Sequence, residues 1–272
     1  MNDYELPLVF FTVLCQWGIG GIIALTLYSL RPIRAGERQM SLSQLKFLVS
    51  GLWLIVVIGS LLSMLHLGQP FGAYRAVLGL AHSWLSREVV AFILLNLSLF
   101  LLLAVCWLRP QNVFWFRVLG VVTSLLGIAA VIISAQIYYQ MVSHPLWHTP
   151  LTPLAFLSTT LLLGFSTLGI VLSRCGVVVP ATVRYGILIG CLLLLATLFG
   201  RYQIAGANAH GIMLWWQLIG SILVGAVLFV LMSLRASLTS SHALMAGAAL
   251  VSGEIAGRML FYHNVMSQFP WF

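Results

Sequence analysis

The sequence predicts an all-α integral membrane protein with eight transmembrane helices. Of its 272 residues, 61% are hydrophobic and 7% are charged, whereas a soluble domain carries about 25% charged residues. The apolar residues form eight runs, each near the ~20 residues that a helix needs to cross a bilayer. These runs lack the polar–apolar alternation of a transmembrane β-strand, and a helix satisfies its own backbone hydrogen bonds in lipid.

The eight runs set the expected spans at about 8–30, 46–65, 89–108, 117–139, 152–173, 183–200, 212–234 and 243–262. The first run follows Asp3 and Glu5 instead of basic residues and is too long for a cleaved signal peptide, so we expect it to remain a helix. The second run ends before Gly68 and Pro70, because proline cannot continue a helix. The third begins after Ser86, which we expect to be its N-cap.

The spans are expected to divide into two halves within a single polytopic domain, residues 1–272. The segment QMVSHPLWHTPLTP, which starts at Gln140, contains three prolines and cannot be helical throughout. It separates the first four runs from the last four, so we expect two four-helix bundles. Small residues four positions apart, Gly120 with Ser124 and Gly253 with Gly257, favour close packing between helices.

The distribution of basic residues predicts the topology. Nine of the 13 lysines and arginines follow the first, third, fifth and seventh runs, and four lie on the opposite side. The nine are Arg31, Arg34, Arg38, Lys46, Arg109, Arg117, Arg174, Arg184 and Arg235, and the four are Arg75, Arg87, Arg201 and Arg258. The positive-inside rule then places both termini in the periplasm. It also accounts for the formal net charge of +8 without nucleic acid, so no such partner is expected.

The titratable groups concentrate toward the predicted periplasmic side. This side holds His66, His82, His144, His148, His210 and His263, with Asp3, Glu5, Glu88 and Glu254, leaving only His242 and Glu37 opposite. Part of this asymmetry reflects the tolerance of histidine for membrane interfaces. The remainder suggests chemistry that needs proton acceptors at one surface of the membrane.

His66 and Glu88 are the expected centre of a quinol site. His66 directly follows the second run and Glu88 directly precedes the third, and the apolar, aromatic segment between them returns the chain to the same face. We expect a pocket roofed by Phe71, Tyr74 and Trp84, whose rings suit the flat ring of a quinol. Histidine and a desolvated carboxylate can accept the two protons that a quinol releases on oxidation. Each residue also has a simpler interpretation, since a carboxylate is favoured in the first turn of a helix and a histidine at an interface.

Other ionisable residues have expected roles around this site or elsewhere in the membrane. Arg75 is expected to position the quinol by donating a hydrogen bond. In the eighth run, Glu254 and Arg258 are four residues apart and therefore share a helix face. Ionisable residues inside a span are costly and often functional. We consider two interpretations of this pair, a structural ion pair and a route for protons.

The cysteines give no indication of a metal centre. The four are Cys15, Cys106, Cys175 and Cys191, and none of them belongs to a C-x-x-C pair. A zinc site or an iron–sulfur cluster needs several converging thiolates. We therefore expect no metal in this chain and interpret the cysteines as small packing residues.

Several motifs together resemble a known family. The order SMLHLGQP, AYRAV and LSREV, with ELPLVFFTVLCQWGIGG at the start and SGEIAGRMLFY near the end, is similar to the membrane anchor subunit of the dimethyl sulfoxide reductase family. The likeness follows the segment order along nearly the whole chain. It is strongest in the first run, between His66 and Glu88, and in the eighth run.

The resemblance implies an eight-helix anchor in the bacterial cytoplasmic (inner) membrane with both termini in the periplasm. Such a subunit holds a molybdopterin catalytic subunit and an iron–sulfur subunit at the membrane and has no metal itself. It binds menaquinol near the periplasmic face, and the electrons pass to the nearest 4Fe–4S cluster of the partner. The residues matching the family's quinol-binding histidine and acid are His66 and Glu88. Arg87 departs from the family, where a small polar residue is expected; it would pair with Glu88 or hold a quinone oxygen.

Two other classes of function remain as alternatives. A haem b-type quinol-oxidising subunit needs paired histidines inside opposed helices, whereas the histidines here lie at the ends of the runs. A polytopic transporter usually shows internal repeats and paired helix breaks near the middle of the membrane. Glu254 is the one candidate residue for such a site, and no paired break is visible.

Overall fold

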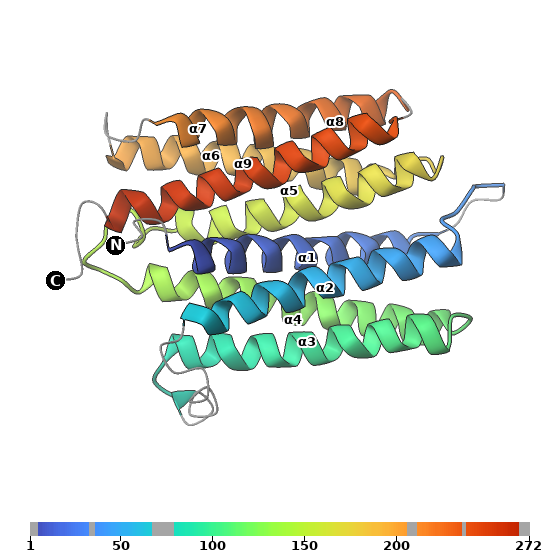
Figure 1. Ribbon diagram of the computed structural model, residues 1–272, viewed down its shortest axis with the longest axis horizontal. Helices are drawn as coiled ribbons and strands as arrows, with labels where there is room; N and C mark the ends of the chain where they lie inside the picture. The colour runs from blue at the N-terminus through green and yellow to red at the C-terminus, as the bar shows by residue number, and fades with distance from the viewer. Residues whose placement is uncertain (1–4, 33–35, 67–78, 206–210, 236–237, 267–272) are drawn as a thin grey trace.

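The part of the chain that the structure describes forms eight membrane-length helices, which lie side by side (Figure 1). The computed structural model describes residues 5–32, 36–66, 79–205, 211–235 and 238–266, and every long regular element in these ranges is helical. The elements are α1 (Leu6–Leu30), α2 (Leu42–His66), α3 (Trp84–Leu108), α4 (Val113–Tyr139), α5 (Leu151–Arg174), α6 (Ala181–Ala205), α7 (Ile212–Gln217), η3 (Leu218–Leu223), α8 (Val224–Ser233) and α9 (Ser240–Met266). The elements α7, η3 and α8 together make the seventh span, so the predicted number and order of spans are confirmed.

Several helices extend beyond the apolar runs that predicted them. The second span begins at Leu42, so Lys46 lies within the helix and not in the preceding loop. The sixth reaches Ala205, and the eighth covers Ser240–Met266. The apolar run marks only the part of a helix that lies in hydrocarbon, and the hydrogen-bonded backbone continues into the polar boundary.

The start of α3 differs from the expectation in a way that affects the site. Its N-cap is Ser83, whose hydroxyl accepts a hydrogen bond from the backbone N–H of Ser86 at 3.3 Å. The helix therefore begins at Trp84, and Ser86 is not the cap. Glu88 consequently lies beyond the first turn, where the helix dipole has little influence. Contacts with other helices must therefore explain the position of the Glu88 carboxylate.

The helix contacts form two groups of four that meet along α1 and α5. In the first group α1 packs on α2 and α4, and α3 packs on α2 and α4. In the second group α5 packs on α6 and α9, while α8 closes the ring between them. Contacts of α1 with α5 join the groups, with smaller contributions from α4 and α9. This arrangement agrees with the expected division into two four-helix bundles.

The joint between the two bundles is a close crossing of α1 and α5. A Cβ atom added to Gly164 would collide with the backbone of Gly20, and one added to Gly20 would collide with the carbonyl of Thr160. Only glycine lets two backbones approach this closely, which increases van der Waals contact where no hydrophobic effect drives association. The small residues singled out in the sequence also lie at contacts. Gly253 faces Ser221 of η3, and Gly120 faces Thr26 of α1.

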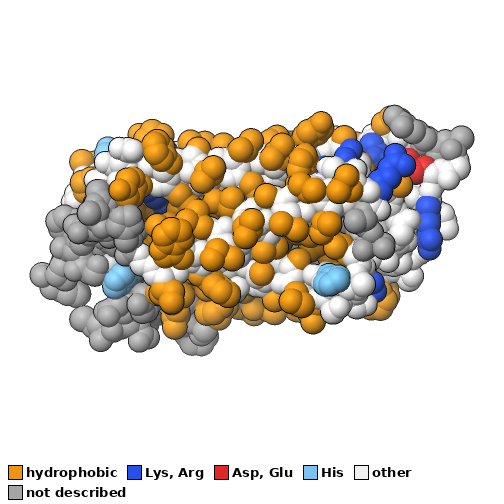
Figure 2. Space-filling view, turned by 90° about the horizontal axis from the view of Figure 1, so that it is seen from above, with side chains coloured by type: hydrophobic (Ala, Val, Ile, Leu, Met, Phe, Trp, Pro, Cys, Tyr) orange, Lys and Arg blue, Asp and Glu red, His pale blue; other side chains and the backbone are white. Residues whose placement is uncertain are grey.

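The surface has the pattern of a membrane protein. Hydrophobic side chains cover the middle of the molecule, and most of the visible lysines and arginines lie at one end (Figure 2). This end, called the arginine-rich end below, is where α1 and α3 finish and α2 and α4 begin. At the other end, called the Glu88 end, α1 and α3 begin and α9 finishes.

The α1–α5 crossing generates a stability prediction. Gly164→Ala places a methyl group against the backbone of α1, so the helices must separate or strain, at a cost of about 1–3 kcal/mol. We expect a lower midpoint of thermal unfolding for the purified complex in detergent. Gly51→Ala is the matched control, because a Cβ atom there meets nothing within 4 Å. Equal midpoints for the two variants would contradict the close crossing.

Candidate functional site

A buried carboxylate lies at the Glu88 end of the first bundle. Glu88 is only 6% exposed, and its Oε1 accepts a hydrogen bond of 2.5 Å from the hydroxyl of Ser134 on α4. The two residues are 46 positions apart in the chain, so the contact depends on the packing of α3 against α4. A carboxylate is expensive to bury in a membrane, and such residues usually serve binding or proton transfer.

The Glu88 carboxylate lines a cavity of about 380 Å³ between α1, α2 and α3. Its walls are mostly apolar and include Phe11 and Phe92, whose ring centroids are 5.0 Å apart. Ile93 and Met64 also line the cavity and are 57% and 40% exposed, so the cavity reaches the lipid-facing surface. A flat apolar molecule dissolved in the bilayer can enter this cavity from the side.

Polar groups accompany Glu88 in the cavity. Asn96 lies two turns further along α3, where its Nδ2 donates to the Oγ of Ser60 at 3.0 Å and to the carbonyl of Phe92 at 2.8 Å. The Oδ1 of Asn96 is buried and has no hydrogen-bond partner in the described part of the chain. A buried acceptor without a partner is unfavourable, and a rotation of the Asn96 amide toward the cavity would let a bound hydroxyl group satisfy it. Ser63 adds a further hydroxyl to the lining.

The structure describes only some of the residues that the sequence assigned to this site. His66 is the last residue of α2 and follows the cavity residue Met64 by two positions, but its side chain lies outside the described part. Phe71, Tyr74 and Arg75 also lie outside the described residues. The pairing of His66 with Glu88 therefore stays a prediction.

Arg87 does not form the expected pair with Glu88, and its other expected role, holding a quinone oxygen, stays a prediction. Its Nε donates to the carbonyl of Leu80 and its Nη2 to the carbonyl of Ala81, both at 2.9 Å. Its guanidinium also lies over the ring of Trp84, 4.4 Å from the centroid. Arg87 thus stabilises the turn before α3 and forms no ion pair with Glu88. Consecutive residues of a helix point in different directions, so a neighbour at i+1 was a poor candidate partner.

Glu254 and Arg258 do not form the expected direct ion pair, although both side chains are described and almost fully buried. The Oε2 of Glu254 accepts from the hydroxyl of Thr159 on α5 at 2.6 Å. Arg258 donates from Nη2 to the Oε1 of Gln16 on α1 at 2.8 Å, and its guanidinium lies 3.8 Å from the ring centroid of Phe156. Each residue therefore bonds to a different helix, and together they attach α9 to α1 and α5.

An aromatic cluster extends from the contact between Arg258 and Gln16 toward the Glu88 end. The hydroxyls of Tyr138 and Tyr262 are 2.7 Å apart, which links α4 of the first bundle to α9 of the second. Trp147 donates from its indole nitrogen to the carbonyl of Phe261 at 3.0 Å, and the two rings are stacked. The segment after α4 is therefore packed into the junction between the bundles.

The described residues do not suit a metal or a membrane-buried haem. They contain no group of three or more histidine, cysteine or carboxylate side chains placed to hold a metal ion, and all four cysteines are free. Within the described helices, histidines occur only close to the ends, at His66, His242 and His263. A haem in the middle of the membrane would need histidines well inside opposed helices, and these positions do not supply them.

Comparison with known proteins identifies the family. The model of the family described as DMSO reductase anchor subunit (DmsC) matches residues 1–264. The chain belongs to the DMSO reductase anchor subunit family. It is therefore a multi-pass protein of the bacterial inner membrane that anchors a multi-subunit oxidoreductase complex, which makes the transporter alternative untenable.

Three curated relatives agree with membership of the anchor family. The protein is 28% identical to the C chain of anaerobic dimethyl sulfoxide reductase from Escherichia coli (strain K12), over 95% of its own length and 94% of the relative. It is 30% identical to the YnfH chain of anaerobic dimethyl sulfoxide reductase from the same strain, again over 95% and 94%. It is 32% identical to the corresponding C chain from Haemophilus influenzae (strain ATCC 51907 / DSM 11121 / KW20 / Rd), over 60% of its own length and 57% of the relative.

The contact between Arg258 and Gln16 generates a second prediction. Gln16→Leu removes the acceptor and leaves a buried guanidinium without this hydrogen bond, which costs about 1–3 kcal/mol. We expect the midpoint of thermal unfolding of the purified anchor complex to fall by several degrees. Gln203→Leu, the same substitution at an exposed position, is the control and should leave the midpoint unchanged. A stable Gln16→Leu variant would show that the contact contributes little.

Proposed function

We propose that this anchor subunit binds menaquinol in the cavity lined by Glu88 and oxidises it to menaquinone. The two electrons would pass to an iron–sulfur partner subunit and from there to a molybdopterin catalytic subunit of a dimethyl sulfoxide reductase-like enzyme. The observation that carries this proposal is the buried Glu88 carboxylate beside a lipid-facing apolar cavity of about 380 Å³. Cavities of about 300–1,000 Å³ with a few polar groups are typical of small-molecule sites.

The lining of the cavity supports binding of a quinol ring. The rings of Phe11 and Phe92 offer apolar and edge contacts to a flat molecule. The free Oδ1 of Asn96 can accept a hydrogen bond from one quinol hydroxyl, and Glu88 can accept one from the other. The isoprenoid tail would leave past the exposed side chains of Ile93 and Met64 into the bilayer.

The residues of this chain would take the protons while the electrons leave. Oxidation of one quinol releases two protons and two electrons. The ionised Glu88 carboxylate, stabilised by the hydrogen bond from Ser134, would accept one proton. His66, at the end of α2, is the proposed second base. When docked, the partner's iron–sulfur cluster would receive the electrons one at a time. Arg75 is the proposed positioning donor, and Tyr74 is proposed to complete the wall.

We further propose that the Glu88 end faces the periplasm and receives the iron–sulfur partner. The concentration of lysines and arginines at the opposite end supports this orientation through the positive-inside rule (Figure 2). Both α1 and α9 have their outer ends on the Glu88 side, so the termini would be periplasmic. The names of the relatives, which are chains of anaerobic dimethyl sulfoxide reductases, support the choice of complex.

The role of Glu88 is tested by Glu88→Gln. Glutamine keeps the size of the side chain and an acceptor for Ser134 but cannot take a proton, so quinol oxidation should slow by about 10²-fold or more. The measurement is turnover of the intact complex with a reduced menaquinol analogue. Glu37→Gln, at the arginine-rich end, is the control and should retain full activity.

A second assay on the same preparations separates loss of chemistry from loss of assembly. An artificial donor that reduces the partner subunits directly should support equal turnover in the wild-type and Glu88→Gln complexes. Undiminished menaquinol turnover in Glu88→Gln would refute Glu88 as a proton acceptor.

Asn96 is expected to contribute to the binding of the quinol. Asn96→Ala removes the free acceptor, so the KM for the quinol analogue should rise about tenfold, equivalent to ~1.4 kcal/mol, while kcat changes less. Ser98→Ala is the control, because Ser98 is on the same helix but bonds to Thr123 of α4. Equal KM values for the two variants would place the quinol elsewhere.

A further inference from the structure

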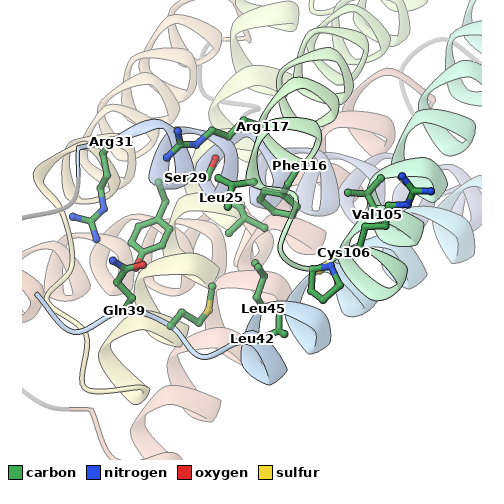
Figure 3. Close-up of a pocket in the computed structure, with 15 residues that line it drawn as sticks. Leu25, Ser29, Arg31, Gln39, Leu42, Leu45, Val105, Cys106, Phe116 and Arg117 are labelled. Carbon is green, nitrogen blue, oxygen red and sulfur yellow. The ribbon is translucent and has the colours of Figure 1, made fainter.

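A second cavity lies at the opposite end of the same bundle. It has a volume of about 190 Å³ and is formed where α1 and α3 finish and α2 and α4 begin (Figure 3). Figure 3 shows Arg31, Ser29, Gln39 and Arg117 toward one side of the cavity, with Leu25, Leu45 and Phe116 near its centre. The cavity is therefore amphipathic, with cationic and polar groups beside an apolar floor. The quinol proposal does not use it.

Two arginines in this cavity have donors that are not used within the protein. The Nε of Arg117 is buried and has no hydrogen-bond partner in the ranges that the structure describes, and the same holds for the Nε of Arg31. A guanidinium is a donor only and cannot lose its proton in a protein. A buried donor without an acceptor is costly, and a movement of the guanidinium toward the cavity would let a ligand with several acceptor oxygens satisfy it.

The charge of the cavity favours an anionic ligand. Arg31, Arg109 and Arg117 all line it. Among the described residues, Glu37 is the one carboxylate at this end, and its Oε1 already forms a 2.7 Å ion pair with Nη1 of Arg31. Two positive charges therefore remain without a carboxylate partner. Arginine binds phosphate oxygens particularly well, through charge-assisted hydrogen bonds.

The position of the cavity favours a lipid as the ligand. It lies at the level where four spans end or begin, at Leu30, Leu42, Leu108 and Val113, which is the boundary between hydrocarbon and water. Leu42 and Val113 belong to its lining and are exposed on the lipid-facing side. A lipid tail can therefore continue from the cavity along the outside of the helices. Basic pockets between helix ends are suited to anionic lipid head groups.

We propose that this cavity binds an anionic phospholipid. The phosphodiester would accept hydrogen bonds from Arg117 and Arg31, and the glycerol would lie beside Ser29 and Gln39. The first part of an acyl tail would fill the apolar floor against Leu25, with the remainder in the bilayer. The bound lipid would neutralise the charge that remains at this end of the first bundle. This site is separate from the Glu88 cavity, which lies at the other end of α3.

Lipid binding by the intact complex tests the proposal. The complex is purified in a neutral detergent and titrated with phosphatidylglycerol, and the bound lipid is counted by native mass spectrometry. The wild type should bind phosphatidylglycerol at least tenfold more tightly than phosphatidylcholine. Arg117→Gln should reduce this binding at least tenfold. Inorganic phosphate is added in a parallel titration; its failure to displace the lipid identifies the lipid as the ligand, and full displacement would overturn the proposal.

Arg184→Gln is the matched control. Like Arg117, Arg184 lies in the first turns of a span at the arginine-rich end and has a buried Nε without a partner in the described residues, but it does not line this cavity. The complex with Arg184→Gln should bind phosphatidylglycerol as tightly as the wild-type complex does. An equal loss in both variants, or none in Arg117→Gln, would overturn the assignment.

A measurement on the unmodified protein avoids any effect of the substitutions on insertion. A phosphatidylglycerol analogue with a diazirine in its acyl tail is bound to the wild-type complex, and the adducts are mapped by peptide mass spectrometry. Adducts within 25–45 and 105–117 are expected. Adducts confined to other segments, such as 174–185, would contradict the site.

Discussion

A polar group inside a membrane must find its partner within the protein, and the bond between Glu88 and Ser134 is where this constraint matters most. The carboxylate is almost completely buried, yet one of its oxygens lies 2.5 Å from a hydroxyl of the neighbouring helix. Lipid offers no alternative partner, so the packing of α3 against α4 fixes the carboxylate in place. The same packing holds it at the wall of a cavity that reaches the lipid-facing surface.

The constraint also explains how two bundles become one anchor. The bundles meet where glycines let α1 and α5 approach, and hydrogen bonds between the bundles reinforce this joint at Arg258 with Gln16 and at Tyr138 with Tyr262. In the proposed function, anchoring and quinol chemistry use different parts of the same helical frame. The two ends of the first bundle have opposite features, a cavity lined by a carboxylate, where we propose a reduced quinone, and a cavity lined by arginines, where we propose an anionic head group.

The helical fold was predictable because each span must be long and apolar, and both properties are local. The burial expected for the Glu88 carboxylate is confirmed, while its role as a proton acceptor stays a proposal. Glu88 was a candidate from the sequence because a carboxylate in a protein with so few charges stands out. Its partner Ser134 and the cavity residue Asn96 were not recognised, because their roles depend on contacts between helices. The spacing of Glu254 and Arg258 correctly placed them on one helix face. It gave the wrong partners, since Glu254 bonds to the hydroxyl of Thr159 on α5 and Arg258 bonds to the amide oxygen of Gln16 on α1.

Photoaffinity mapping of the quinol tests the central claim most directly. A menaquinone analogue with a photoreactive group on its ring would be reduced, bound to the intact complex and cross-linked, and the adducts located by peptide mass spectrometry. Adducts at residues 60–64 or 88–96 are expected, and excess unlabelled menaquinol should suppress them. Adducts restricted to the second bundle or to the arginine-rich end would contradict a quinol site at Glu88.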